Sequence, residues 1–205
     1  MTSYKSVIGG ALALSFAASL AVAQTPAAPP TRIRGTIEKL DGQTLVVKSR
    51  DGADVNVKLA DNTPVRTVLK QTLADVKQGG FVGITAMPQP DGTQKAIEIH
   101  IFPESMRGTG EGHRPWDLVP NSTMTNATVD SEVAVSDGKK LVLKYKDGEK
   151  TFIVPPDAII VTFAPATMAD VKPGVKVVIN ANKQPDGSIT AANLTVGRDG
   201  VNPPM

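Results

Sequence analysis

Two pairs of the form Glu-x-His carry the side chains best suited to chemistry in this sequence. Glu98 and His100 stand two residues apart, and Glu111 and His113 repeat that spacing a short distance later. In a β-strand, residues at this spacing point to the same face, so each pair presents a carboxylate and an imidazole together. If the four converged, they would suit Zn²⁺, or Cu²⁺ with help from a methionine. The pairs therefore favour one of two interpretations, a divalent-metal site or ordinary solvated and interface positions.

A second candidate region is the segment of residues 103–126, which contains the only tryptophan, Trp116. One interpretation is a structural strap, in which Trp116 packs into a seam and Arg114 pairs with Asp117 or Glu111. The other is a recognition loop in which Trp116, Arg114 and Asp117 bind a ligand, because loops on rigid scaffolds often carry function.

The sequence gives little support for catalysis. The chain has no Cys and two His, which removes disulfides, thiolate metal sites and Cys nucleophiles. No serine-hydrolase elbow, zinc-protease or phosphate-binding motif is present. Many of the aspartates precede a glycine, where turn geometry explains them. We therefore expect a non-enzymatic protein that needs no cofactor.

The N-terminus is typical of a secretory signal peptide. Lys5 is the only charge before residue 32, an apolar run covers residues 7–22, and Ala-Val-Ala precedes Gln24. A membrane anchor is less favoured, because a spanning helix needs about 20 apolar residues. We expect a signal peptide over residues 1–23, cleavage after Ala23 and a Pro/Ala tether over residues 24–31. The mature chain should then be periplasmic or secreted, with no later transmembrane segment.

The remainder of the chain contains an internal repeat with two copies. A shift of 95 residues superimposes matching turns and apolar positions from residue 72 onward, and further upstream the shift becomes 96, with Asp61 over Asp157 and Val65 over Val161. The matching stretches are residues 40–52 with 136–148, 72–80 with 167–175, and the tetrapeptide Gln-Pro-Asp-Gly at 89–92 with the same at 184–187. A repeat of this kind decides the architecture and is therefore considered before any single motif.

Each copy has the pattern of three strands, a helical turn and a hairpin. Asp-Gly pairs between alternating apolar runs predict the hairpins, and the Thr-x-x-Asp sequences at Thr72 and Thr167 predict a capped turn. This order matches a five-stranded OB-type barrel. We predict an all-β protein with two tandem five-stranded OB-like barrels. The predicted divisions after the tether are barrel one at 32–102, an ordered strap at 103–126, barrel two at 127–197 and a tail at 198–205.

The repeat also tests the first Glu-x-His pair. In the second copy Asn193 replaces Glu98 and Thr195 replaces His100. The barrel therefore does not require the carboxylate or the imidazole, which fits a special site and an exposed strand face equally well.

Three stretches of the sequence resemble small exported bacterial proteins of the domain of unknown function 5666. They are the opening Gly-Thr-Ile-Glu-Lys-Leu-Asp-Gly, the Leu-Ala-Asp-Val-Lys turn and the Pro-Asp-Gly hairpin. The resemblance covers nearly all of both copies and implies an OB-like barrel, although the second copy lacks the early glycine. The middle segment also resembles exported proteins that carry the label "metal ABC transporter permease". A permease needs several spanning helices, and this sequence has none after the signal.

The predicted function is a non-enzymatic exported binding or interaction module. Removal of the predicted signal peptide, which contains Lys5, changes the net charge from +2 to 2 − 1 = +1. Aromatic residues are 4% of the chain. A low net charge and few aromatic residues both disfavour nucleic acid as a partner. The partner is expected to be an envelope protein or an anionic polymer. The alternative is an accessory protein of metal homeostasis that binds a divalent metal through His100 and His113.

Overall fold

The computed structural model describes residues 31–136 and 138–204, which form an all-β fold as predicted. The predicted signal peptide and nearly all of the tether lie outside these residues. The strands are β1 (Thr31–Asp41), β2 (Thr44–Ser49), β3 (Asp54–Lys58), β4 (Val65–Lys70), β5 (Phe81–Pro88), β6 (Gln94–Ile101), β7 (Gly112–Pro115), β8 (Thr123–Val135), β9 (Gly138–Tyr145), β10 (Gly148–Val154), β11 (Ile159–Pro165), β12 (Lys176–Lys183) and β13 (Ile189–Val196). Three short 3₁₀ turns accompany them, η1 (Leu73–Asp75), η2 (Glu104–Met106) and η3 (Met168–Asp170).

The repeated Gln-Pro-Asp-Gly turns form the hairpins that the sequence predicts, β5–β6 and β12–β13. Gly92 and Gly187 have φ of 84° and 82°, a region that suits glycine. The carboxylate of Asp91 accepts the Thr93 N–H, and that of Asp186 accepts the Ser188 N–H. Each turn is thus fixed by local interactions alone.

The predicted capped turns are also confirmed, as single 3₁₀ turns. Asp75 and Asp170 accept the backbone N–H of Thr72 and Thr167, respectively. Val76 and Val171 directly after these turns are buried. Met168 in the second turn, in contrast, is 38% exposed.

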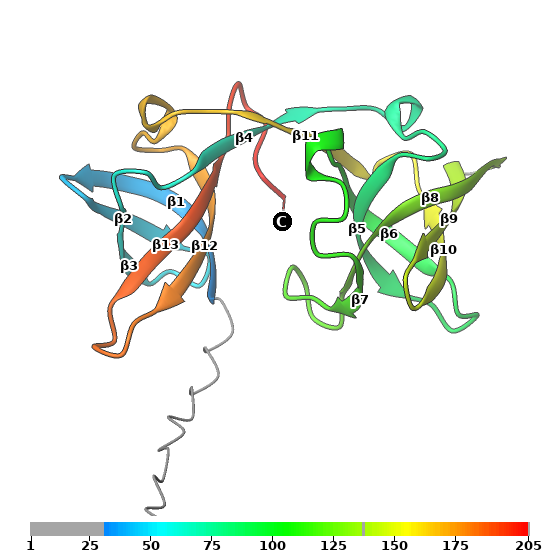
Figure 1. Ribbon diagram of the computed structural model, residues 1–205, viewed down its shortest axis with the longest axis horizontal. Helices are drawn as coiled ribbons and strands as arrows, with labels where there is room; N and C mark the ends of the chain where they lie inside the picture. Colours follow the sequence, from blue (N-terminus) through cyan, green and yellow to red (C-terminus); the bar gives the residue numbers. More distant parts are fainter. Residues whose placement is uncertain (1–30, 137, 205) are drawn as a thin grey trace, which may run out of the picture.

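Two five-stranded barrels form, but neither is built from one continuous segment. The first barrel closes in the order β1–β2–β3–β13–β12, with β12 returning to β1. The second closes in the order β8–β9–β10–β6–β5, with β5 returning to β8. Each ring has the strand order of an OB-type barrel, closed by a short parallel contact. The predicted boundaries 32–102 and 127–197 are therefore wrong as barrel boundaries, because the final hairpins are exchanged (Figure 1).

The exchange depends on two strands that the sequence did not predict. After β3 and β10 the chain does not fold back; β4 and β11 instead run across between the two barrels and pair with each other antiparallel (Figure 1). Val68 lies opposite Phe163, and these residues are repeat equivalents, since 163 − 68 = 95. The side chain of Thr67 donates to the Val196 carbonyl, as Thr162 does to the Ile101 carbonyl. The two halves are therefore related by a pseudo-two-fold axis near Val68.

Three apolar clusters follow this arrangement. Strands of both copies contribute to the core of each barrel, and a third, small cluster lies under the crossing strands. The first core includes Ile37, Leu45, Val47, Ile179 and Leu194, the second includes Ile84, Ile99, Leu141, Leu143 and Phe152, and the third contains Val68, Val161 and Phe163. Burial of each hairpin in the core of the opposite barrel contributes to the stability of the fold.

In the first strand of each copy, the structure pairs equivalent residues at a different offset from the one that the sequence alignment predicts. A β-bulge follows Ile37 in β1 and Val129 in β8, and these residues pair with Val47 and Leu143. The second strands differ by 143 − 47 = 96, but the first strands differ by 129 − 37 = 92. The longer β8–β9 hairpin accounts for this difference, and Gly35 corresponds to Ala127, so the second copy has no glycine at this position in the structure either.

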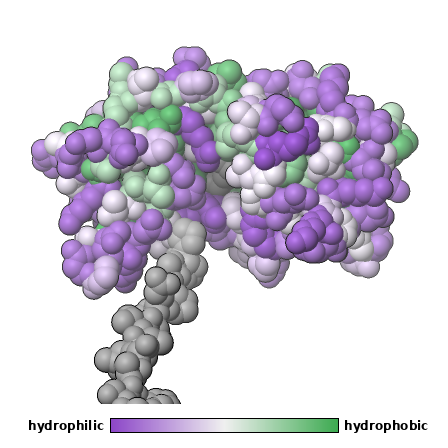
Figure 2. Space-filling view, viewed as in Figure 1, coloured by the Kyte–Doolittle hydropathy of each residue, from purple (hydrophilic) through white to green (hydrophobic). Residues whose placement is uncertain are grey.

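The face of the molecule seen in Figure 2 is mostly hydrophilic over both barrels, with smaller hydrophobic patches. Within the described residues, the fold contains no helix of the length and hydrophobicity that a membrane span requires.

Candidate functional site

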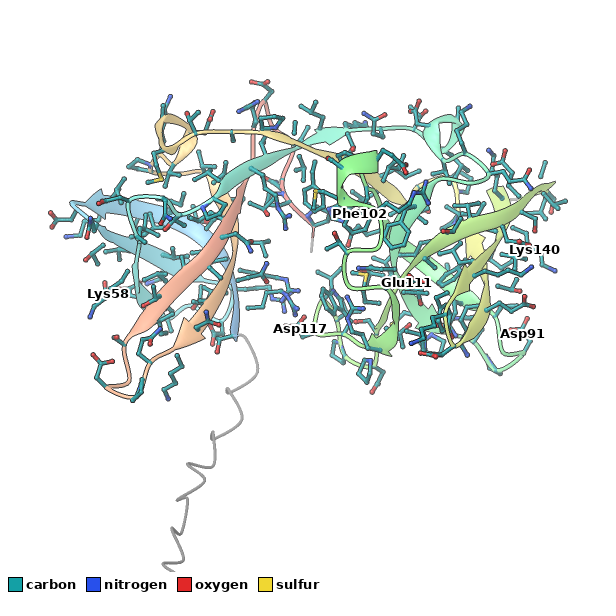
Figure 3. All side chains as sticks on the ribbon, viewed as in Figure 1. Lys58, Asp91, Phe102, Glu111, Asp117 and Lys140 are labelled. Carbon is teal, nitrogen blue, oxygen red and sulfur yellow. The ribbon has the colours of Figure 1, made fainter. Side chains whose placement is uncertain are left out.

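The strap joins the two barrels. It begins on the second barrel, where β7 pairs with β8, and its next residues reach β1 of the first barrel. The Asp117 carboxylate accepts hydrogen bonds from Arg32 Nη1 at 2.7 Å and from both Nη atoms of Arg34. Figure 3 shows Asp117 between the barrels, facing nitrogen-tipped side chains of the first. The strap therefore fixes the second barrel against β1.

The expected pairing of Arg114 with Asp117 or Glu111 is wrong. Asp117 is occupied by β1, and Arg114 donates to the Gly110 carbonyl at 2.7 Å. Burial alone would raise the pKa of the Asp117 carboxyl, but the Arg34 hydrogen bond and the charges of Arg34 and Arg32 hold this pKa below its ordinary value. Asp117 is thus an anion near neutral pH.

Trp116 lies at the seam, which we define as the region where β1 and β12 face β5, β6 and β8. The guanidinium of Arg32 stacks 3.7 Å above the Trp116 ring, and that of Arg114 lies 5.2 Å from it. Two cations against one ring are held by the attraction between positive charge and the aromatic face.

Glu98 and His100 lie together, but they are not solvated. Their exposed fractions are 0% and 1%, which corrects the interpretation of an exposed strand face. β11 pairs along the edge of β6 and contributes Phe163 to this region. Glu98 Oε1 lies against His100 Nδ1, and Glu98 Oε2 accepts the Thr85 hydroxyl at 3.0 Å. The His100 ring stacks on Phe163 with a centroid separation of 4.5 Å.

The second Glu-x-His pair does not join the first. Glu111 Oε1 accepts the Lys146 backbone N–H at 3.0 Å, and His113 Nδ1 lies 2.7 Å from the Thr125 hydroxyl. Burial lowers the pKa of His113, and the charges of Lys150 and Arg114 lower it further. Across residues 31–136 and 138–204, no three His, Cys, Asp or Glu side chains gather as a metal site would need. The predicted four-ligand set is therefore not assembled in this fold.

The residues at the equivalent positions of the second copy make different hydrogen bonds. In place of the Thr85–Glu98 contact, Asn180 donates to Asn193 at 3.0 Å. In place of His100, Thr195 accepts the Nε–H of Arg66 at 2.9 Å. Divergence between the repeats thus puts an imidazole on one side of the axis and a guanidinium on the other.

These groups surround one cavity of about 150 Å³ at the seam. Its lining comes from both barrels, both crossing strands and the strap. The residues are Arg32, Arg66, Gly83, His100, Phe102, Thr109, Arg114, Trp116, Met124, Asn126, Phe163, Val178 and Asn180. Three buried polar atoms of this lining have no hydrogen-bond partner in the described chain, namely His100 Nε2, Trp116 Nε1 and Asn126 Oδ1. Such atoms are costly in a folded protein, so a polar cavity occupant is expected.

Sequence reasoning missed Arg32 and Arg66. Arg66 lies on a strand that the sequence did not predict, and neither residue belongs to a motif. The sequence alignment places Val65 over Val161, but the structure makes Arg66 the equivalent of Val161, because Arg66 pairs with Thr195 as Val161 pairs with His100. Because one copy has a charged residue where the other has an apolar one, the fold itself does not require either residue type at this position.

A larger hollow of about 490 Å³ lies where β1, β2 and β12 of the first barrel meet Leu118 of the strap and the C-terminal residues 202–204. Its cations are already engaged, since Lys48 pairs with Asp54, Arg50 donates to the Leu118 carbonyl and Lys176 donates to Thr36. Solvated and internally bonded charges explain this surface, so the seam cavity is the stronger candidate site.

Comparison with known families adds one match. Residues 34–100 match the family described as Domain of unknown function (DUF5666). No curated protein and no solved structure matches the chain. The matched segment begins within β1 and ends within β6, so it covers most of the first repeat. In this fold that repeat contributes three strands to the first barrel and a hairpin to the second, so the sequence unit of the family and the barrel do not coincide.

Proposed function

We propose that this chain is an exported, non-enzymatic binding module whose ligand site is the seam cavity. The observation that carries the proposal is the cluster of buried, unpartnered polar atoms of His100, Trp116 and Asn126 around one cavity. Unpaired buried polar groups each cost about 1–3 kcal/mol, and a bound ligand recovers that cost.

Several features support binding rather than catalysis. The only hydroxyl side chain in the cavity lining is Thr109, and it donates to the Met106 carbonyl at 2.6 Å. His100 is held by Glu98 and Phe163 and has no neighbouring nucleophile to activate. The proposal also includes a second DUF5666-like unit in the later repeat, an N-terminal signal peptide and a periplasmic or secreted location, all of which rest on sequence pattern.

The alternative function in metal homeostasis has weaker support. Glu98 and His100 offer two adjacent ligands, but His113 belongs to a separate hydrogen bond with Thr125. A stable Zn²⁺ site needs three or four protein ligands. We therefore retain metals only as members of the test panel.

The test uses the single tryptophan as a reporter of the site. The full mature chain, labelled with ¹⁵N, is titrated with divalent metals, small organic and inorganic anions, oligonucleotides and anionic polysaccharides. We expect one class to shift the Trp116 indole signal and the amides of β5, β6 and β12. Saturable binding that leaves the indole signal in place would show that the ligand site lies elsewhere. Turnover of generic esters or phosphate esters would contradict the non-enzymatic assignment.

A further inference from the structure

We infer that the seam cavity binds a compact oxyanion, a carboxylate or phosphate group that also carries a hydroxyl proton. This inference rests on the proposed function and specifies its ligand class. Monohydrogen phosphate and short hydroxy acids share this chemistry. The argument uses the charge, geometry and size of the lining.

The charge of the lining is positive. Arg32, Arg66 and Arg114 all border the cavity. Asp117 is the one carboxylate that pairs with any of them, and it is shared between Arg32 and Arg34. The other nearby carboxylate, Glu98, lies behind His100 and contacts its imidazole. Arg66 and Arg114 have no carboxylate partner among the described residues, so a bound anion would supply the missing countercharge.

Burial makes that countercharge valuable. Desolvation lowers the pKa of the Arg32, Arg66 and Arg114 guanidinium groups. Guanidinium groups nevertheless remain protonated in proteins, because their ordinary pKa lies far above neutral pH. The three cations are therefore held charged in a partly dry region where an anion interacts strongly.

The geometry leaves the correct donors unused. Arg66 places the face of its guanidinium on Phe163, with Cζ 3.9 Å from the ring centroid, and it donates from Nε to Thr195. Its two Nη atoms make no hydrogen bond within the described chain. A guanidinium that is stacked by its face keeps its in-plane N–H groups available, which is the arrangement that binds an oxyanion through two parallel hydrogen bonds.

The acceptors define the remainder of the ligand. If the Nδ1 proton of His100 is directed to Glu98, Nε2 is a lone-pair acceptor, and Asn126 Oδ1 is a second acceptor because its Nδ2 donates to the Thr109 carbonyl. Neither acceptor has a partner. A fully deprotonated anion would leave both unpaired, whereas a ligand O–H would satisfy one of them. This is the reason for a ligand with a hydroxyl proton.

The size of the cavity limits the ligand further. A volume of about 150 Å³ corresponds to about five water molecules at ~30 Å³ each. That space suits a phosphate ion or a two- to three-carbon hydroxy acid, and it is small beside the roughly 300–1,000 Å³ of pockets that enclose nucleotides and other large ligands. Gly83 borders the cavity, and a Cβ there would lie 2.7 Å from Asn126 Oδ1 and 3.1 Å from Phe102. The bare backbone at Gly83 therefore keeps part of this volume open.

Isothermal titration of the full mature chain with inorganic phosphate, glycolate, acetate and sulfate tests the inference. We expect saturable 1:1 binding of phosphate or glycolate, with acetate and sulfate weaker. Phosphate and glycolate are separate arms, so the preferred source of the oxyanion is identified directly. The absence of saturable binding for all four anions would overturn the inference.

Variants locate the site. Arg66→Gln removes the free guanidinium edge, and we expect at least about a tenfold loss of affinity, since a hydrogen bond to a charged group is worth about 1.5–3 kcal/mol. Arg66→Val copies Val161, the residue that the strand registers make equivalent, and provides a second variant in which the same loss of affinity is expected. Lys58→Gln removes the same charge far from the seam (Figure 3) and should leave affinity unchanged.

The outcomes are distinct. Equal losses in the Lys58 and Arg66 variants would show nonspecific attraction and overturn the oxyanion assignment. An uncharged ligand that shifts the Trp116 indole signal while all four anions fail would leave the binding module standing without this ligand class. If neither kind of ligand shifts that signal, both proposals fail.

Discussion

Val68 lies directly opposite Phe163 where β4 crosses β11, and the two residues occupy the same position in the two repeats. One pair of crossing strands thus relates two barrels that each contain strands from both halves of the chain. The arrangement resembles a domain-swapped dimer in which the two protomers are joined covalently.

The exchange predicts which residues can be cross-linked. Thr36 pairs with Lys176 across β1 and β12, and Cα atoms of antiparallel partners lie about 4.5–5.5 Å apart, within the disulfide range. Thr36→Cys with Lys176→Cys should therefore form an intramolecular disulfide, seen as a faster-migrating monomer on a non-reducing gel. The chain has no native cysteine to interfere.

The matched control places the second cysteine in the same repeat. Phe81 is the equivalent of Lys176, since 176 − 95 = 81, and it would face Thr36 if each barrel were continuous. In the exchanged fold Phe81 faces Thr128. Thr36→Cys with Phe81→Cys should stay reduced in the monomer, and a disulfide there would contradict the exchange.

The buried Glu98–His100 pair predicts a non-additive response to mutation. His100→Ala leaves a carboxylate with 0% exposure beside an empty space, and breaking a buried pair costs about 3–5 kcal/mol. Glu98→Asn with His100→Thr installs the pair that the second copy uses. We expect the double variant to be more stable to urea than His100→Ala alone. Additive losses in a double-mutant cycle would show that the two side chains do not act together.

The turn carboxylates predict a loss of stability in acid. Hydrogen bonds from neighbouring Thr and Ser residues hold the pKa of Asp75, Asp91, Asp170 and Asp186 below the ordinary value of 3.8. The unfolded chain therefore binds more protons than the folded chain as pH falls below about 4. Their stabilisation is present above pH 3.8 and is lost as pH falls through the lowered pKa values.

Thermal unfolding between about pH 5 and pH 2.5 measures this effect. The variant with Asp91→Asn and Asp186→Asn keeps an acceptor at both hairpins but cannot titrate there. Its melting temperature should fall less steeply than that of the native chain. Parallel curves would show that the hairpin carboxylates do not contribute.

The close approach of β1 to β2 predicts a severe effect of a single methyl group. A Cβ on Gly35 would lie 2.1 Å from the Lys48 carbonyl oxygen and 2.7 Å from Val47. Backbone must move to relieve that overlap, so Gly35→Ala should destabilise the fold by about 1–3 kcal/mol or more. Urea unfolding measures it, and an unchanged midpoint would contradict the tight packing at this position.

The strap predicts an optical signal. Asp117→Asn weakens the contacts to Arg32 and Arg34, so Trp116 should become more mobile and its fluorescence emission should shift to longer wavelength. The Asp117 side chain is 51% exposed, so stability should change by no more than about 1 kcal/mol. Asp54→Asn, which breaks an exposed pair with Lys48, should leave the emission in place. Identical spectra for all three proteins would show that Asp117 does not hold the strap.

Local chemistry made part of this fold predictable. Asp91-Gly92 and Thr72 with Asp75 determine their own turns through contacts a few residues apart, and alternation fixes which face of each strand is buried. The pairing of strands is different, because the repeat makes two partners equivalent. Ile33 faces Ile179 in β12, yet the corresponding strand β5 has the same apolar pattern, so no local feature distinguishes a continuous barrel from an exchanged one.

The site was hidden for the same reason. Glu98 and His100 were identified as residues of interest, but His100 stacks on Phe163 of β11, a strand from the other repeat. Arg66 reaches Phe163 and Thr195 only because β4 crosses toward the opposite barrel. Residues that meet across a pseudo-two-fold axis are far apart in sequence and share no motif.

The exchanged hairpins also determine the order in which the two barrels can be completed during synthesis of the chain. The second barrel has all its strands once residue 154 has been made, whereas the first barrel waits for β12 and β13, which end at Val196. The strands that appear first, β1 to β3, are thus the last to be completed and stay open while the rest of the chain is synthesised. Such unpaired edges favour aggregation. A chain that is truncated before β12 should therefore lose the first barrel and keep the second.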